Sequence, residues 1–333
     1  MKSIWKEAAA CVLMGLVLPG LLLRYTGGRL FPAGNQPAET AATQPPTVPT
    51  ATADAGDAGD VTVRLMMADG SSREMELETY LVGVVLAEMP GYFESEALKA
   101  QSVAARTYTH KTCLSQDKHD GRVCTDFSCC QAYLTEEEYL GRGGTRQALD
   151  KIRQAVADTE GMVLTYEGEL IEATYFSCSG GSTEDARAVW GADFPYLRAV
   201  DSPGEENAEF YEDTVEFSRE EFNRALGLEL TGDPADWIGK ATSTPGGGVD
   251  TIHIGGKTFQ GKELRRLLGL RSTAFTMTGS PDGITVSTRG FGHRVGMSQY
   301  GADAMSAAGA SYREILSHYY PGTTLEKYQD SIA

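Results

Sequence analysis

An alternation of apolar and polar residues defines the first folded element of this 333-residue chain. In the stretch VTVRLMM, which begins at Val61, apolar residues recur at every second position, and the turn Asp69-Gly70 separates it from EMELETYL. A period of two is typical of a strand with one buried face, and Asp-Gly favours a tight reversal. The pattern therefore predicts a β-hairpin that leads into the first helix.

An almost wholly apolar segment follows this hairpin. From Thr79 to Met89 the chain has no polar stripe, which predicts a short helix that is buried on most sides and ends at Pro90-Gly91. Glu88 lies in its last turn, where the helix dipole and apolar neighbours disfavour a negative charge and are expected to raise its pKa. A carboxyl group that is protonated near neutral pH suits general acid catalysis. The alternative is an exposed glutamate at a frayed helix end.

A second helix is predicted after this break, in ESEALKAQSVAARTYTHK. It begins with an acidic turn and has an apolar face that includes Leu98 and Tyr108, with Gln101 and Arg106 interspersed on it.

Residues 205–275 have the pattern of an appended lobe. EFSREEFNRALG is an amphipathic helix, and GGGVDTIHIGGKTFQGKELRRLLG alternates into strand and helix. A further strand, GITVSTRG, then leads into a glycine-rich segment. We therefore predict an α+β fold, in which mixed helices and antiparallel strands form a two-lobed domain with a central cleft.

The N-terminus differs in composition from the rest. Two lysines precede an apolar run from Ala8 to Leu23, which favours a membrane anchor over residues 1–25, with a cleaved secretory signal or a buried helix as alternatives. Residues 26–60 are rich in Ala, Thr, Pro, Gly and Asp, which predicts an extended linker. The main domain is then expected over residues 61–330, outside the cell membrane that the anchor crosses once.

The charge balance restricts the class of partner. The chain has 46 acidic and 29 basic side chains, a net charge of −17. This argues against nucleic acid or an anionic membrane surface as the main ligand. A weakly charged or neutral substrate fits better.

A group of cysteines marks a candidate metal or disulfide site. Within twelve residues the chain offers an imidazole and three thiols, on a stretch that is predicted to be an irregular loop. Clustered cysteines in an exported protein also favour disulfides, and free thiols are a third possibility. The candidate metal ligands are His119, Cys124, Cys129 and Cys130, with His110 or Cys113 as a replacement if the adjacent pair cannot both bind.

Two glycine-rich stretches contain polar residues suited to ligand contact. GFGHRVGMSQYGADAM has glycines that permit close approach of the backbone, although a packed histidine is the ordinary fate of His293. YFSCSGGSTEDARAVWG contains Ser179 but lacks the G-x-S-x-G spacing of a nucleophile turn.

Several stretches together resemble the stage II sporulation protein D family, which is related to the amidase-enhancer domain. They are YLVGVVLAEMPGYFESEALKAQSVAARTY, CQAY at 130–133, SGG with VWG and PYLRAVDSP between Ser179 and Pro203, GKELRRLLGLRST at 261–273, and GFGHRVGMSQYGADAM at 290–305. This ordered set covers nearly all of residues 61–325 and is more specific than any one of its parts.

The resemblance implies a membrane-anchored lytic transglycosylase of peptidoglycan, with Glu88 as its catalytic acid. Such an enzyme protonates the glycosidic oxygen between N-acetylmuramic acid and N-acetylglucosamine, and the muramyl C6 hydroxyl then attacks C1 to give a 1,6-anhydro end. Because the nucleophile belongs to the substrate, one carboxylate suffices, whereas ordinary glycosidases use two.

The same resemblance places the glycine-rich segments beside the cleft. It also implies a structural zinc at the cysteine stretch that takes no part in the chemistry. Many members have a histidine where this chain has Phe176, which weakens an acid–base role for that segment. The candidate substrate-binding residues are Arg106, Tyr108, Tyr175, Ser179, His293, Gln299 and Tyr300.

Family members act in engulfment during endospore formation and are located in the mother-cell membrane. They act after an amidase, the stage II sporulation protein P, and they prefer glycan strands that have been stripped of peptide. The expected partners are therefore glycan strands, that amidase and membrane-bound engulfment proteins. Two alternatives remain at this point. One is a non-catalytic glycan-binding module that activates a cell-wall amidase, and the other is a hydrolase that uses Cys178, or the cysteine stretch with His293.

Overall fold

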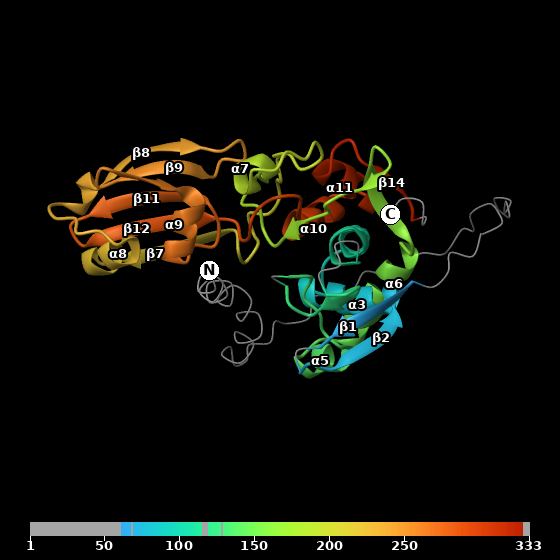
Figure 1. The fold of residues 1–333 in the computed structure, drawn as a ribbon. Helices are drawn as coiled ribbons and strands as arrows, with labels where there is room; N and C mark the ends of the chain where they lie inside the picture. Colours follow the sequence, from blue (N-terminus) through green and yellow to red (C-terminus); the bar gives the residue numbers. More distant parts are fainter. Residues whose placement is uncertain (1–60, 68, 115–118, 128, 329–333) are drawn as a thin grey trace, which may run out of the picture. The chain divides into compact units, whose positions relative to one another are not determined.

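The computed structural model describes residues 61–67, 69–114, 119–127 and 129–328 (Figure 1). The predicted membrane anchor and linker, residues 1–25 and 26–60, lie outside these described residues. Within the described ranges, no helix has both the length and the apolar character needed to cross a membrane.

The predicted hairpin is confirmed. Strand β1 (Thr62–Met66) pairs antiparallel with β2 (Ser72–Glu76), and Val63 and Leu65 of β1 are fully buried. A third strand, β3 (Arg122–Cys124), pairs parallel with β1. The cysteine stretch is therefore anchored to the hairpin by a strand, where the sequence predicted only an irregular loop.

Two helices form the centre of the first core. Helix α3 (Leu77–Glu88) is buried along most of its length, as its apolar pattern predicts, and α4 (Ser95–Tyr108) packs against it and continues into the π-helix η1 (Thr109–Leu114). The other helices that pack against α4 are α6 (Arg146–Asp158), α10 (Gln299–Ala307) and α11 (Tyr312–Tyr319). The N- and C-terminal parts of the described chain thus share one core.

Short sheets complete this first core. Strand β4 (Met162–Tyr166) lies between β5 (Glu169–Leu170) and β14 (Thr324–Lys327), and β6 (Tyr175–Phe176) pairs parallel with β13 (Met297–Ser298). Two short helices also belong to this part of the chain. Helix α5 (Glu136–Gly141) begins with a capping box at Thr135. Helix α7 (Ala186–Trp190) ends at Gly191, which has a left-handed backbone conformation.

A second hydrophobic core is built from residues between 212 and 289. One sheet has the order β11-β12-β7 and the other β10-β9-β8. The elements are β7 (Glu212–Phe217), α8 (Arg219–Leu226), η2 (Pro234–Asp236), β8 (Ile238–Ser243), β9 (Val249–Ile254), β10 (Lys257–Gln260), α9 (Gly261–Leu268), β11 (Ala274–Ser280) and β12 (Gly283–Arg289). They group together in Figure 1 and enclose Phe222, Ile254 and Phe259.

The boundary that we predicted for this lobe, residues 205–275, ends too early. Strand β12 pairs with β7 over six positions, from Ile284↔Phe217 to Arg289↔Glu212, and β11 pairs with β12. The strand GITVSTRG therefore closes the second core before it leads back to the first. Sequence pattern alone did not show this pairing, because β7 and β12 are far apart along the chain.

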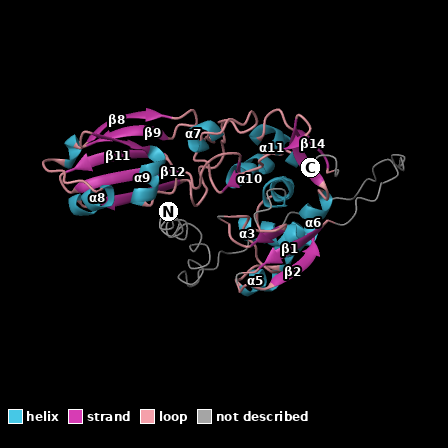
Figure 2. Cartoon of the chain, viewed as in Figure 1, coloured by secondary structure: helices cyan, strands magenta, loops and turns pink. Residues whose placement is uncertain are grey.

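Helices and mainly antiparallel strands coexist in the described chain, which confirms the α+β class (Figure 2). The cleft that we predicted between two lobes stays a prediction.

A buried ion pair links the two cores. Glu184 is fully buried, and its Oε1 accepts hydrogen bonds from Thr244 Oγ1 at 2.6 Å and from the backbone N–H of Gly248 at 3.0 Å. The guanidinium of Arg294 contacts Glu184 at 3.3 Å and also donates to the carbonyl of Gly246 at 2.8 Å. Arg294 adopts a left-handed backbone conformation with φ of 66°, which these contacts must stabilise against its steric cost.

Candidate active site

Glu88 is the last residue of α3 and is partly buried. Its Oε1 accepts a hydrogen bond from the backbone N–H of Ala132 at 3.0 Å. Burial raises the pKa of Glu88 to about 7, although the hydrogen bond from Ala132 and the side-chain amide of Gln299 favour its ionised form. No cation forms an ion pair with Glu88 within the described ranges, so desolvation dominates. The carboxyl group can therefore hold or release a proton near neutral pH.

Close packing on α3 places the Ala132 N–H group at Glu88. The N–H of Leu134 donates to the carbonyl of Gly83 at 3.0 Å, and the ring of Tyr133 stacks on Tyr80 with centroids 5.8 Å apart. A Cβ atom on Gly83 would lie only 2.2 Å from the Tyr133 ring. Only glycine at this position lets the segment lie so close to the helix. Ala132 was not predicted as a site residue, although the motif CQAY contains it.

A hydrogen-bonded chain of polar groups lies next to this carboxyl group. Tyr175 Oη donates to Gln131 Oε1 at 2.7 Å, and Gln131 Nε2 donates to Thr109 Oγ1 at 2.8 Å. Burial raises the pKa of Tyr175, and the charge of nearby Glu88 adds to this effect. Gln131 was not predicted as a site residue. It is buried and fixes the hydroxyl of Tyr175 beside the acid.

Gln299 approaches Glu88 from another part of the chain. It begins α10, directly after β13, whose Met297 and Ser298 pair with Tyr175 and Phe176 of β6. Its Nε2 atom is buried and has no partner of hydrogen-bond geometry among the described residues. The parallel pairing of β6 with β13 thus brings two predicted site residues, Tyr175 and Gln299, to the carboxyl group. Their contact with substrate stays a prediction.

His293 lies in an aromatic surrounding. Its ring is 5.2 Å from that of Trp190 and 5.6 Å from that of Phe176, and its Nδ1 accepts a hydrogen bond from the Val295 N–H at 3.1 Å. Burial, with a smaller effect of the Arg265 charge, lowers the pKa of His293 to about 4. The imidazole is therefore neutral at neutral pH and is not a proton donor there.

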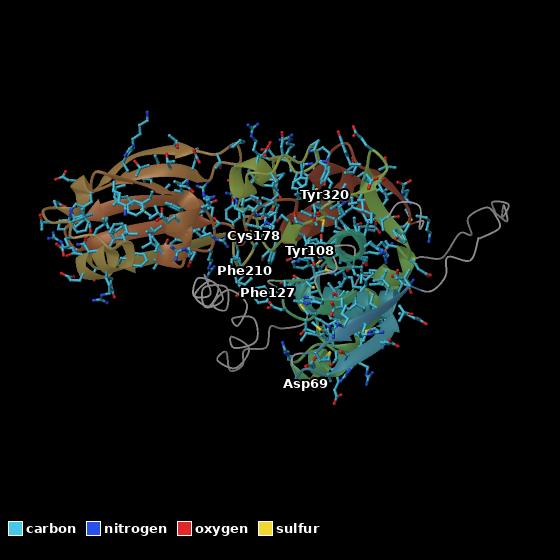
Figure 3. The ribbon with its side chains drawn as sticks, viewed as in Figure 1. Asp69, Tyr108, Phe127, Cys178, Phe210 and Tyr320 are labelled. Atoms are coloured by element: carbon cyan, nitrogen blue, oxygen red, sulfur yellow. The ribbon has the colours of Figure 1, made fainter. Side chains whose placement is uncertain are left out.

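Tyr300 is part of a cluster of aromatic rings. Its ring meets Phe93 edge to face at 4.9 Å and Phe210, labelled in Figure 3, at 6.2 Å. Tyr92, which is 72% exposed, packs on Phe93, and its side chain is hydrogen-bonded to Tyr300. Packing is the clearest role of Tyr300, and sugar contact stays a prediction.

Three other candidates are buried or half-buried in the fold. Arg106 is fully buried, and its guanidinium donates two hydrogen bonds to the Glu78 carboxylate, from Nε to Oε1 at 2.8 Å and from Nη2 to Oε2 at 2.5 Å. Ser179 is also fully buried, and its hydroxyl donates to Glu205 at 2.8 Å. Tyr108 is half-buried near Cys113. The polar atoms of Arg106 and Ser179 are therefore used inside the fold, and the substrate contacts predicted for all three residues stay predictions. Spacing along a helix or loop did not reveal those buried partners.

The cysteine stretch brings four possible metal ligands together. The ligand atoms of His119, Cys124, Cys129 and Cys130 lie within 4.8 Å of one another, and His119 Nε2 is 3.1 Å from Cys129 Sγ. The N–H groups of Cys129 and Cys130 both donate to the carbonyl of Asp126, and this turn lets the adjacent thiols face the same point. Among the described cysteines none forms a disulfide.

These four donors fit a zinc ion. Imidazole nitrogen and thiolate sulfur are the ligands of structural zinc, which bind it at about 2.0 to 2.3 Å in a tetrahedral arrangement. Burial and neighbouring thiols raise the pKa of Cys129 to about 12, since thiolates so close together repel one another without a cation. A divalent cation would remove that repulsion.

The chain is similar in sequence to several known proteins. Residues 70–166 match the family described as "Stage II sporulation protein". Stage II sporulation protein D of Bacillus subtilis (strain 168) is 42% identical over 78% of this chain and 77% of the relative, and that of Bacillus amyloliquefaciens is 41% identical over 77% and 76%. The amidase enhancer of Bacillus subtilis (strain 168) is 32% identical over 74% of this chain and 40% of the relative. Identity at this level over most of both chains shows that the protein belongs to the stage II sporulation protein D family.

Proposed function

We propose that this protein is a lytic transglycosylase that cleaves the bond between N-acetylmuramic acid and N-acetylglucosamine in peptidoglycan. The observation that carries the proposal is Glu88, a partly buried carboxyl group with a pKa of about 7 and no ion-pair partner in the described part of the chain. A single carboxyl group poised near neutral pH can act first as an acid and then as a base.

In the first step Glu88 donates its proton to the glycosidic oxygen. The bond from C1 to that oxygen breaks, and positive charge develops on the muramyl ring. In the second step the Glu88 carboxylate takes the proton of the muramyl C6 hydroxyl while that oxygen bonds to C1. This restores the protonated acid and leaves a 1,6-anhydro end, so no water is consumed.

The neighbours of Glu88 suit this alternation. When the proton has left, the Ala132 N–H group stabilises the carboxylate through its hydrogen bond. Gln299 Nε2, buried and without a partner of hydrogen-bond geometry in the described ranges, is a donor available to the same carboxylate or to a sugar oxygen. Tyr175, whose hydroxyl donates to Gln131, is a third polar group near the Glu88 carboxyl group.

Product analysis tests the proposal. The full-length protein is incubated with purified glycan strands, and the products are identified by mass spectrometry. Anhydro ends are expected. Reducing ends would indicate a hydrolase, including one that uses Cys178 or the cysteine stretch, and released stem peptides would indicate an amidase or peptidase. Either result would contradict the proposal.

A second candidate function is a glycan-binding activator of a cell-wall amidase. It is favoured by the 32% identity to a relative named amidase enhancer. This function predicts no products from glycan strands alone, together with faster peptide release when an amidase is added. We propose the stage II sporulation protein P amidase as a partner in either case, in engulfment during endospore formation and at the mother-cell membrane.

We also propose that His119, Cys124, Cys129 and Cys130 hold a structural zinc. The ion would supply positive charge that fixes the turn before Ala132, and the chemistry of the sugar does not pass through it. We expect about one equivalent of metal per chain. The Cys124→Ser variant should lose the metal and also be less stable to heat, because metal binding is coupled to folding. Cys178→Ser, outside the cluster, should keep the metal. A disulfide mass shift without metal would contradict this proposal.

The membrane anchor is a further proposal. Full-length protein should fractionate with membranes, and deletion of residues 1–25 should release an active enzyme. A full-length protein found in the soluble fraction without cleavage would contradict it.

A further inference from the structure

Trp190 is one of the two large apolar side chains that are exposed in the described part of the chain, and it is 43% exposed. It ends α7, and its indole leans on the His293 ring at 5.2 Å with an angle of 55° between the planes. One side of the indole is thus supported by His293 while a large part of it stays accessible to solvent. An aromatic side chain in this position can stack on the apolar face of a pyranose ring.

Arg265 is close enough to the same histidine for its charge to act on it. It projects from α9, and its Nε donates to the carbonyl of Leu270 at 3.4 Å. The next residue, Arg271, accepts a hydrogen bond from the N–H of Gly292 at 3.1 Å, directly before His293. The positive charge of Arg265 also contributes to the lowered pKa of His293. These contacts bring the second core to the edge of the site.

Arg265 differs from the arginines around it in its lack of an acidic partner. Arg271 pairs with Asp213, Arg289 with Glu212, and Arg294 with Glu184. Among the described residues no carboxylate pairs with Arg265, although the chain has a net charge of −17. The guanidinium is half-buried, and partial burial strengthens its attraction for an anion. An acidic ligand group would complete the missing pair.

Both side chains connect to Glu88 through His293. The His293 ring contacts Phe176 at 5.6 Å, and the preceding residue, Tyr175, is close enough to Glu88 for the glutamate charge to raise its pKa. The indole and the guanidinium are therefore connected to the surroundings of the acid through His293 and the segment Tyr175-Phe176.

We propose that Trp190 and Arg265 form a subsite for a hexosamine that carries a carboxylate, the D-lactyl group of peptide-free N-acetylmuramic acid. The choice of sugar rests on the proposed function. Trp190 stacks on the pyranose ring, and the Arg265 guanidinium pairs with the carboxylate. In a strand that still carries stem peptides, the lactyl group is an amide without charge, so this subsite distinguishes stripped from unstripped glycan. A carboxylate at the end of a stem peptide has the same chemistry, and the experiment separates the two sources.

Tryptophan fluorescence tests the subsite directly. The sequence has three tryptophans: Trp5, replaced by Phe for this experiment, Trp190, and Trp237, which is buried in the second core. The full-length Trp5→Phe, Glu88→Gln protein is titrated with peptide-free strands, peptide-bearing strands and chitooligosaccharides, which have no carboxylate. The Glu88→Gln change keeps the ligands intact. We expect a fluorescence change on binding that disappears in Trp190→Phe, and tightest binding for peptide-free strands.

The arginine variants give the decisive comparison. Arg265→Gln should weaken binding of peptide-free strands at least tenfold and leave chitooligosaccharide binding unchanged, and Arg265→Lys should weaken it less because it keeps the charge. Lys262→Gln, an exposed change on the same helix, should have no effect. Equal loss for all three ligands, or no loss, would overturn the proposal. Arginine-dependent binding that is tightest for peptide-bearing strands would also overturn it, in favour of the peptide carboxylate.

These outcomes are distinguishable from failure of the proposed function. If the wild type releases anhydro ends but the Arg265→Gln variant binds peptide-free strands normally, the subsite is refuted and the transglycosylase proposal is not. If binding depends on Arg265 but the wild type forms no anhydro product, the transglycosylase proposal is refuted. The protein would then be a glycan-binding protein that recognises the carboxylate.

Discussion

Glu88 and Glu184 are two carboxylates withdrawn from water, and their surroundings differ. Glu184 is fully buried and accepts hydrogen bonds from two backbone N–H groups, one hydroxyl and the guanidinium of Arg294. Glu88 accepts one backbone N–H group, from Ala132, and has only the neutral amide of Gln299 besides.

The difference shows that the number of hydrogen-bond donors, and not burial alone, sets the state of a carboxylate removed from water. A carboxylate surrounded by donors is a structural anchor, and Glu184 joins the two cores in this way. A carboxylate with too few donors retains a proton at neutral pH, which costs stability and provides a general acid. The shortage of donors at Glu88 is therefore the feature on which the proposed function depends.

Glu88→Gln should produce the largest effect, on turnover. The change removes the transferable proton and keeps the shape, so release of anhydro ends should fall by about a hundredfold to ten-thousandfold, or more because the same group acts as base. Wild-type activity should also decline as pH rises through about 7, since the acid must be protonated.

Glu94→Gln is the matched control for turnover. Glu94 is exposed just before α4, and its change should leave activity near normal. A greater loss in Glu94→Gln than in Glu88→Gln would show that the acid has been misassigned.

Arg294→Met tests the other half of the comparison. Removal of the guanidinium leaves Glu184 buried without its cation and deprives several carbonyl groups of a donor, so the free energy of unfolding should fall by about 3–5 kcal/mol. Denaturant titration measures this loss. In the Arg294→Met, Glu184→Gln double variant the total should be less than the sum of the single losses. Strict additivity would argue against direct coupling of the pair.

Glu88→Gln should also stabilise the protein, in contrast to changes at Glu184. The folded pKa of about 7 lies above the value of 4.5 for a free glutamate, so the folded state binds the proton more tightly than the unfolded state. Wild-type stability is therefore lost progressively as pH rises from about 4.5 to 7, up to about 3 kcal/mol. Unfolding experiments at pH 4 and pH 8 should show the variant's advantage only at pH 8. An equal difference at both values would contradict the raised pKa.

Gly83→Ala should have a smaller effect than the changes at Glu88 and Arg294. The new methyl group would collide with Tyr133 and displace the segment that carries Ala132. Overpacking of this kind costs about 1–3 kcal/mol of stability, and loss of the Ala132 hydrogen bond should raise the pKa of Glu88 further. Denaturation and a pH–activity profile test both effects. An unchanged profile would show that Ala132 does not tune the acid. Gly141→Ala is the control, because this glycine also lies in a helix, α5, and no atom lies within 4 Å of the new Cβ.

Local pattern predicted the elements that have a strong period. The hairpin β1–β2, the apolar helix α3 and the amphipathic helix α8 follow from alternation or from helical spacing, and these predictions are confirmed. The placement of Glu88 at the end of a buried helix was also predictable, because the apolar run and Pro90 mark that end.

Long-range pairing was not predictable from pattern. The contacts of Ser179 with Glu205 and of Arg106 with Glu78 use polar residues far apart in sequence, so both side chains looked available for a ligand. Ala132 was missed because it contacts Glu88 through its backbone N–H group, and the alanine side chain gives no indication of such a contact in the sequence. The end of the second core was misplaced because β12 is defined by its partner β7.

Direct titration of the Glu88 carboxyl group tests the central claim, that a shortage of donors holds a proton on this side chain. The carboxyl stretching band is followed by infrared difference spectroscopy between wild type and Glu88→Gln over pH 3 to 9. A titration with a midpoint near pH 7 would agree with the account. A midpoint near 4.5, the ordinary value for glutamate, would contradict it and make Glu88 a structural residue.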